Sequence, residues 1–163
     1  MADETVRLAA ALEAVASAQE RLLACLLEQR PALVAGRHGD VEAAVARADV
    51  EVRRLAVAER GRVAAAQALA DARGLPGARW ALLAAGVDAE ERALLAPLVD
   101  RVEHLVRDLE LANAVNGQIV RQELEVMDAS MRGLAGAGPR SYTAAGARAD
   151  APPPRPMMLN TAA

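Results

Sequence analysis

The chain has 163 residues, a formal net charge of −3 and a pI near 5.5, and about a quarter of its residues are alanine. It contains no phenylalanine, one tryptophan and one tyrosine, so few of the aromatic and β-branched runs that are typical of strands are available. All nineteen basic residues are arginines that alternate with Asp and Glu, whereas nucleic-acid binding depends on a clustered basic surface. We therefore expect an all-α protein whose long helices pack through small side chains, with no nucleic-acid partner.

The sequence also argues against membrane insertion. The longest uncharged apolar run, residues 80–87, is far shorter than the roughly 20 residues that a membrane-spanning helix needs. The first residues, MADETVRL, lack the charged-then-apolar order of a signal peptide. Cys25 is the single cysteine, so no internal disulfide can form. These features predict a cytoplasmic protein.

The first predicted helix runs from about residue 4 to residue 30. Its apolar residues recur at spacings of three, four and seven, as on one face of a helix; they are Leu8, Leu12, Val15, Leu22, Leu26 and Leu33. Gln19 and Gln29 lie on the same stripe. Pro31 has no backbone N–H, so it should kink this helix or make it restart for one last turn before Gly36.

A second helix is predicted after a turn at residues 36–39, with Asp40 as its N-cap. Its inner face consists mainly of alanine and valine, and Gly74, followed closely by Pro76, should end it. Because the connecting turn is short, the two helices should lie antiparallel and form a helical hairpin over residues 4–74.

A short helical turn from Trp80 to Gly86 should pack on the end of the hairpin. Asp88 and Glu91 then have the spacing of a capping box, which predicts the start of a third helix over residues 89–134. Pro97 should kink this helix or divide it into two pieces.

The expected architecture is an elongated, coiled-coil-like bundle of the hairpin and the third helix. It forms one helical domain over residues 1–135. Residues 136–163 are rich in Gly, Ala, Pro and Arg, a composition that predicts a disordered C-terminal tail.

No pattern of catalytic or metal-binding residues is apparent. Cys25 lies beside the first apolar stripe, as a packed thiol does, and His38 and His104 are far apart in the sequence. The chain has no lysine, which excludes a phosphate-binding P-loop, and no serine lies in a G-x-S-x-G setting. The sequence therefore predicts a protein that is not an enzyme and has no metal or other cofactor.

Asn113 and Asn116 are the most informative residues of the third helix. An asparagine within a helix costs helix propensity, and an amide on an apolar stripe costs more unless it finds hydrogen-bond partners. Such residues can set the register of a coiled coil, or they can mark a surface for a partner helix. Gly117, directly after Asn116, favours the second interpretation because a mid-helix glycine permits close backbone approach.

At these residues the chain resembles the FlgN family of flagellar export chaperones. The resemblance rests on Asn113-x-x-Asn116-Gly117, on the helix that continues from it, and on Tyr142-x-x-x-Gly146 some 25 residues later. It implies a cytosolic chaperone that binds hook-filament junction (hook-associated) proteins of the FlgK and FlgL type. It also implies that the chaperone prevents their premature association and delivers them to the flagellar type III export gate.

The resemblance further implies two binding regions. The cargo-binding residues of the third helix would be Leu109, Asn113, Asn116, Gly117, Ile119, Val120, Leu124, Met127 and Met131. Tyr142 and Gly146 in the tail would dock on the export gate protein FlhA. Ser141 and the proline-rich end, residues 152–156, depart from the family pattern.

A coiled-coil scaffold or assembly adaptor unrelated to flagella is the alternative. Such a protein would bury the apolar stripe of the third helix in a stable homodimer, whereas a chaperone would expose the stripe until its cargo binds. A homodimer of the chaperone itself is also compatible with the pattern.

Overall fold

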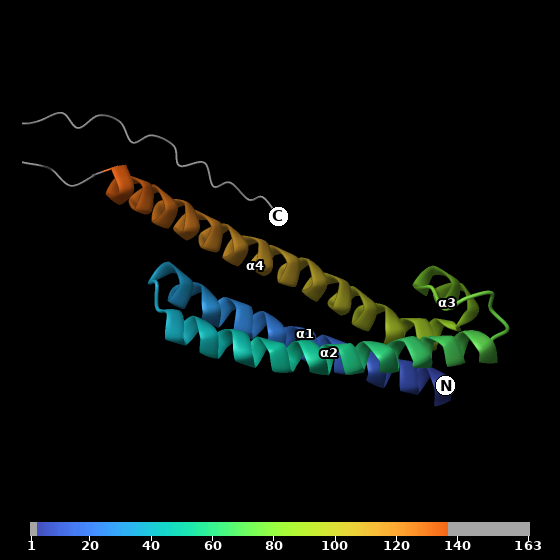
Figure 1. Cartoon of the computed structure of the whole chain (residues 1–163). Coiled ribbons are helices and arrows are strands. Elements are labelled where there is room, and N and C mark those ends of the chain that lie inside the picture. The colour runs from blue at the N-terminus through green and yellow to red at the C-terminus, as the bar shows by residue number, and fades with distance from the viewer. Residues whose placement is uncertain (1–2, 137–163) are drawn as a thin grey trace, which may run out of the picture. The chain divides into compact units, whose positions relative to one another are not determined.

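The computed structural model describes residues 3–136, with side chains through residue 133, and this part of the chain is all α (Figure 1). Its helices are α1 (Asp3–Val34), α2 (His38–Ala72), α3 (Trp80–Gly86) and α4 (Ala89–Gly136). The chain divides into two compact units, Met1–Gln122 and Glu123–Ala163, and the division falls within α4. The helix prediction is therefore confirmed, while the tail predicted from residue 136 onward lies almost entirely outside the described residues. None of the described helices is long and apolar enough to cross a membrane.

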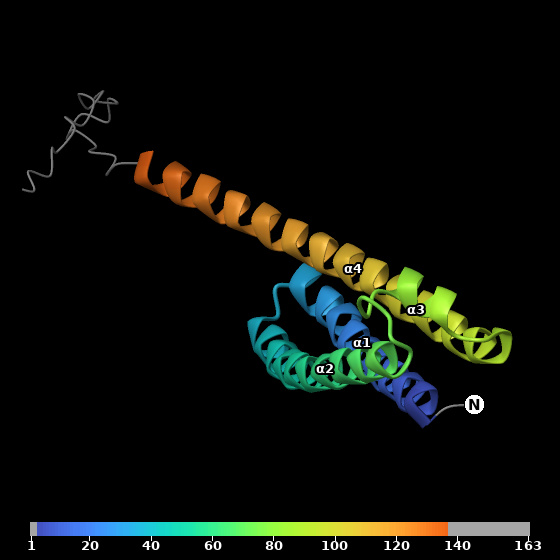
Figure 2. The ribbon, with the colours of Figure 1, turned by 90° about the vertical axis from the view of Figure 1, so that its right-hand side faces the viewer.

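Helices α1 and α2 form the predicted antiparallel hairpin and lie side by side in both ribbon views (Figures 1 and 2). Gly36 ends α1 with φ of 62°, a left-handed conformation that glycine adopts without strain, and the N–H of Arg37 donates to the carbonyl of Ala32 at 3.0 Å. Gly74 has φ of 63° and ends α2 in the same way. The two helix ends predicted from glycine are thus formed by helix C-terminal motifs.

The prediction that Asp40 caps α2 was wrong. The N-cap is Arg37, and α2 begins at His38, so Asp40 lies inside the first turn. The Asp40 carboxylate accepts a hydrogen bond from Nε of Arg37 at 2.7 Å. An acidic residue in a first turn also interacts favourably with the helix dipole.

Neither proline divides its helix. Helix α1 continues through Pro31 to Val34, and α4 continues through Pro97 as one helix. A proline in a helix removes one backbone hydrogen bond, but its φ is compatible with helical geometry, so tertiary packing can hold the helix together. In α4 this packing includes Leu95, which is fully buried two residues before Pro97.

The core of the first unit lies where α1 begins, α2 ends and α4 begins, with α3 packed beside them (Figure 2). Its buried members are Leu8, Leu12, Ala66, Leu69, Ala70, Leu83, Val87 and Leu95. Four of the eight come from the last turns of α2 and from α3, so the short helix predicted around Trp80 closes this end of the bundle. Burial of such side chains is the main source of stability for the unit.

Glu91 links three helices at this end. The predicted capping box is confirmed, because the Asp88 carboxylate accepts from the N–H of Glu91 at 2.8 Å and Glu91 accepts from the N–H of Asp88 at 3.3 Å. The buried Glu91 carboxylate also accepts from Oγ1 of Thr5 in α1 at 2.8 Å. Nη2 of Arg73, just after α2, donates to both of its oxygens at 2.6 and 2.7 Å. A residue that the sequence indicates only as a helix cap is therefore also a tertiary contact.

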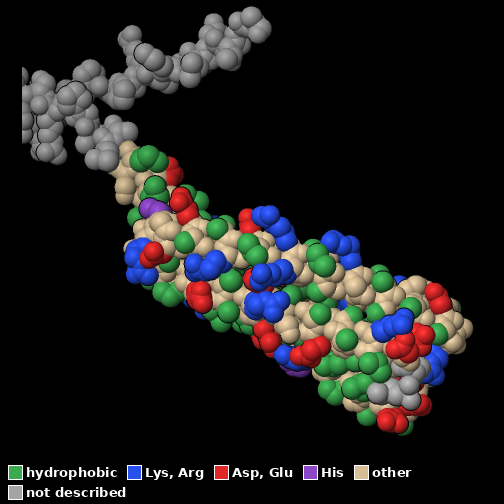
Figure 3. Space-filling model, turned by 90° about the horizontal axis from the view of Figure 1, so that it is seen from below, with side chains coloured by type: hydrophobic (Ala, Val, Ile, Leu, Met, Phe, Trp, Pro, Cys, Tyr) green, Lys and Arg blue, Asp and Glu red, His purple; other side chains and the backbone are tan. Residues whose placement is uncertain are grey.

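Ion pairs join α4 to α1, and α2 to α1, at two further places in the first unit. Arg101 of α4 donates to Glu20 and Glu13 of α1, and these hydrogen bonds raise the pKa of its guanidinium. Within the hairpin, Glu51 of α2 accepts from Arg21 of α1 at 2.9 Å and from Arg54 at 2.6 Å. The hydrogen bond from Arg21 is the main reason that the pKa of the Glu51 carboxyl is lowered. Elsewhere acidic and basic side chains are mixed, as on the face shown in Figure 3.

Candidate partner-binding site

Helix α4 has a packing face, which we define as Leu95, Leu98, Val102, Leu105, Leu109, Ala112 and Asn116. These residues follow the alternating three- and four-residue steps of a helix that packs along a neighbour. All of them are buried or half-buried, and all belong to the first unit. The contact of Glu91 with Thr5 and that of Asn116 with Leu26 show that α1 and α4 run parallel. The packing face therefore lies toward α1.

Asn116 is the last residue of the packing face and is only 5% exposed. Its Nδ2 donates to the backbone carbonyl of Leu26 at 2.8 Å and to Oε1 of Gln29 at 3.2 Å. Its Oδ1 accepts from Nε of Arg30 at 3.3 Å. A buried amide with three partners on one helix fixes the position of α4 along α1, which is the register-setting role that buried asparagines have in coiled coils.

An open face of α4 begins beside Asn116. We define the open face by its helical spacing in the sequence: Asn113, Gly117 and Val120 lie in the first unit, and Leu124, Met127 and Met131 lie in the second. Leu124 is 58% exposed and Met131 is 61% exposed, and Asn113, Val120 and Met127 are exposed as well. Exposed leucine and methionine side chains at helical spacing form a surface that can bind the apolar face of another helix.

The open face is displaced around the helix from the packing face. From Ala112 the positions on the stripe follow at Asn116, Val120 and Leu124, which are three successive steps of four residues; Asn116 is the polar member. An extra four-residue step of this kind breaks the heptad pattern and moves the apolar stripe to the next face of the helix. Within the first unit, Val120 is exposed and so lies off the side of α4 that packs on α1.

Gly117 lies on the open face and is half-buried. A Cβ atom at this position would meet only Nη1 of Arg121, at an ordinary contact distance of 3.5 Å. No part of the described chain therefore requires glycine here, although a mid-helix glycine costs about 1 kcal/mol relative to alanine. The position leaves room for the close approach of another chain.

The structure separates the residues predicted from the sequence into two groups. Leu109 and Asn116 belong to the packing face, and Ile119 follows it at half-buried exposure, seven residues after Ala112. The other six predicted cargo residues make up the open face. Tyr142 and Gly146 lie outside the described residues. Sequence reasoning did not identify Arg30 as a partner of Asn116, although Gln29 on the apolar stripe of α1 was a signal.

The open face carries no charged side chain. Its side chains are apolar apart from one exposed amide. Cys25 is half-buried, and within residues 3–136 no group of three or more His, Cys, Asp or Glu side chains is placed to hold a metal ion. The site is therefore defined by shape and apolar exposure.

The fold defines a class of protein, an all-α helical bundle with exposed apolar residues along its last helix. A family model described as FlgN protein matches residues 1–149, a range that includes both Asn113-x-x-Asn116-Gly117 and Tyr142-x-x-x-Gly146. The chain belongs to the FlgN family, a family of flagellar export chaperones. Among curated proteins and among solved structures no similar chain was found.

Proposed function

We propose that this protein is a cytoplasmic chaperone of flagellar type III export that binds hook-filament junction proteins through the open face of α4. The observation that carries the proposal is the exposure of four apolar residues at helical spacing on α4, Val120 in the first unit and Leu124, Met127 and Met131 in the second. Junction proteins have terminal segments that become ordered on assembly, so their apolar faces need cover beforehand. A helix-in-groove contact with the open face would provide this cover and prevent premature association.

The methionines suit this role because their flexible, polarizable side chains adapt to different apolar partners. Two of the six open-face residues are methionine, and both lie in the second unit of the chain. This composition supports binding of more than one junction protein of the FlgK and FlgL type. Asn113 would supply an exposed amide for a polar contact beside the apolar ones.

Delivery to the export gate is the second part of the proposal. Tyr142 and Gly146, within the range matched by the family, would dock on the export gate protein FlhA. Because these residues follow the open face in the sequence, cargo binding and gate docking would use separate segments. The proposal requires no cofactor and no catalytic step.

The test is co-purification of the full chain with the terminal helical segments of its own organism's junction proteins. We expect a complex with the wild type and with Tyr142→Ala, and loss of the complex with Val120→Asp plus Leu124→Asp. The matched control is Leu111→Asp plus Val126→Asp, which adds the same charge at exposed apolar residues on other faces of α4. No complex with any junction protein, together with a tight homodimer in sedimentation, would refute the proposal in favour of a scaffold.

A further inference from the structure

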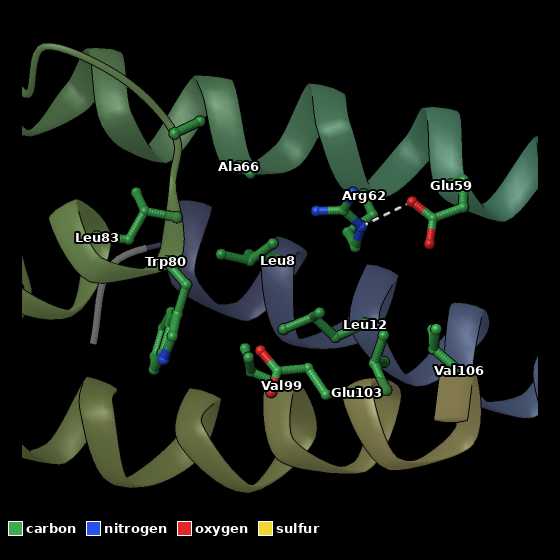
Figure 4. Close-up of a pocket in the computed structure, with 12 residues that line it drawn as sticks. Leu8, Leu12, Glu59, Arg62, Ala66, Trp80, Leu83, Val99, Glu103 and Val106 are labelled. Atoms are coloured by element: carbon green, nitrogen blue, oxygen red, sulfur yellow. Dashed lines mark hydrogen bonds and ion pairs between the residues drawn. The ribbon is translucent and has the colours of Figure 1, made fainter. Parts of the chain in front are cut away.

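The first unit contains a pocket of about 320 Å³ between its helices (Figure 4). Leu8 and Leu12 of α1 lie between α2 and α4, and Trp80 of α3 lies at one end of the pocket. Val99 and Val106 line it from α4. The lining is mainly apolar and the volume is large enough for a bulky apolar side chain, so water is a poor occupant.

The pocket lies at one end of a line of residues on α2. Val45, Val52, Glu59 and Ala66 recur every seven residues, so they occupy the same position on the helix. Glu59 and Ala66 line the pocket, and Val45 and Val52 are exposed. Val45 and Val52 therefore extend an exposed apolar line along α2 from the pocket.

A second line of residues, at one heptad position of α4, runs along that helix from the pocket. Val99 and Val106 are followed at the same heptad position by Asn113 and Val120, and these two residues belong to the open face. The pocket-lining residue Glu103 is likewise followed by Glu110 and Gly117. The side of α4 that lines the pocket is therefore the side on which the open face begins.

We propose that the pocket takes an apolar anchor residue from a partner helix that lies along these two lines and adds a fourth long helix to α1, α2 and α4. This inference rests on the proposed function, since the partner helix is the terminal segment of the cargo. It adds a second cargo contact, remote in sequence from the methionines and built from α2 as well as α4. Helices are commonly bound in this way, with one or two anchor side chains placed in pockets between helices.

The charges at the pocket define the chemistry of the partner helix. Glu59 is paired with Arg62 at 2.8 Å, whereas neither Glu103 nor Glu110 forms an ion pair within residues 3–133. Two carboxylates seven residues apart along one edge favour a helix with arginine or lysine beside its apolar face. A second copy of this chain would place its own Glu103 and Glu110 near the same edge if it docked through α4, which disfavours it as occupant.

Trp80 makes the proposal measurable because it is the only tryptophan of the chain and lines the pocket. The probe is a synthetic, tryptophan-free peptide of the junction protein's terminal helical segment, titrated into the full-length chain. We expect the emission of Trp80 to shift on binding and affinity to fall as salt is added. Val52→Glu and Val106→Glu should each weaken binding about tenfold or more.

Matched controls are available on the same helices. Val57→Glu on α2 and Leu111→Glu on α4 introduce the same substitution at exposed residues, Val57 being 61% exposed and Val52 51% exposed. These controls should leave the affinity and the Trp80 shift unchanged, and circular dichroism should show equal helix content in all variants. Glu103→Arg should weaken binding and reduce its salt dependence.

Three results would overturn the inference. If Val52→Glu and Val106→Glu bind as the wild type does while Val120→Asp plus Leu124→Asp does not, the pocket is not a cargo contact and the proposed function stands. If the wild-type chain binds no junction peptide, both proposals fail. If Val52→Glu instead dissolves a homodimer of the free chain, the occupant is a second copy.

Discussion

The packing face and the open face of α4 both consist mainly of apolar residues with an asparagine, but the packing face is buried or half-buried and most of the open face is exposed. The packing face ends in an asparagine with three hydrogen bonds to α1, and the open face begins with an exposed asparagine and continues to exposed Leu124 and Met131. Apolar spacing alone does not distinguish them, because a covered stripe and an uncovered stripe have the same period. The difference teaches that the four-residue steps after Ala112 place Val120 off the side of α4 that packs on α1, so that position along the helix, and not composition, separates the two faces.

The largest expected effect is a loss of folding stability, and it is tested by replacing one leucine of each face with alanine. Leu95→Ala should lower the free energy of unfolding by about 3 kcal/mol, because Leu95 is fully buried and its removal leaves a cavity. Leu124→Ala should change it by less than about 0.5 kcal/mol, because Leu124 is 58% exposed. Urea unfolding followed by circular dichroism measures both. Equal losses for the two variants would mean that the open face is covered within the free chain.

Arg73→Met tests the hydrogen bonds between Arg73 and Glu91, which lies four residues before the packing face. It should cost about 2 to 3 kcal/mol in the free energy of unfolding, because it removes the guanidinium that hydrogen-bonds to both oxygens of the buried Glu91 carboxylate. Arg7→Met breaks an exposed pair with Asp3 and should cost less than about 0.5 kcal/mol. If the two variants unfold at the same urea concentration, the Glu91 contact does not hold α4 in place.

Replacing the two asparagines with alanine should give a smaller difference in folding stability, and one that distinguishes the two faces directly. Asn116→Ala should lower the free energy of unfolding by about 1 to 2 kcal/mol, since three hydrogen-bonding groups of α1 lose a buried partner. Asn113→Ala should leave it unchanged or raise it by about 0.5 kcal/mol, because Asn113 is exposed and alanine has the higher helix propensity. The same pair should behave oppositely in cargo binding, with Asn113→Ala the weaker binder. A larger stability loss for Asn113→Ala would contradict the assignment of the two faces.

The smallest effect concerns the hairpin that covers the packing face, and it depends on pH. The folded-state pKa of Glu51 is lowered from its ordinary value of 4.5, chiefly by the hydrogen bond from Arg21. The ionised carboxylate therefore contributes stability above the unfolded-state pKa, and this contribution is lost as the pH falls through the lowered folded-state pKa. Glu51→Gln should unfold at lower urea than the wild type at pH 7, and the two midpoints should converge on acidification below 4.5. A difference that persists or grows in acid would assign the effect to packing.

Much of the fold follows from local features of the sequence. Left-handed glycines end α1 and α2, the Asp88 and Glu91 pair starts α4, and helical periodicity accounts for the long elements between them. The prediction that failed, the cap at Asp40, concerns a position where a neighbouring residue outweighs a local preference of about 1 kcal/mol; at Pro97 the helix is not divided, and the kink stays a prediction.

The candidate site depends on both the sequence and the tertiary structure. The sequence by itself identified the stretch around Asn113, Asn116 and Gly117 and the family to which the chain belongs. Only the tertiary structure separated Asn116, whose hydrogen-bond partners lie on α1 about 90 residues earlier, from the residues that remain exposed. It alone brought Leu8 and Leu12, Ala66, Trp80 and Val99 around one pocket. The physical reason is that helical period and capping are local properties of the chain, whereas which face of a helix is covered depends on contacts between segments far apart in the sequence.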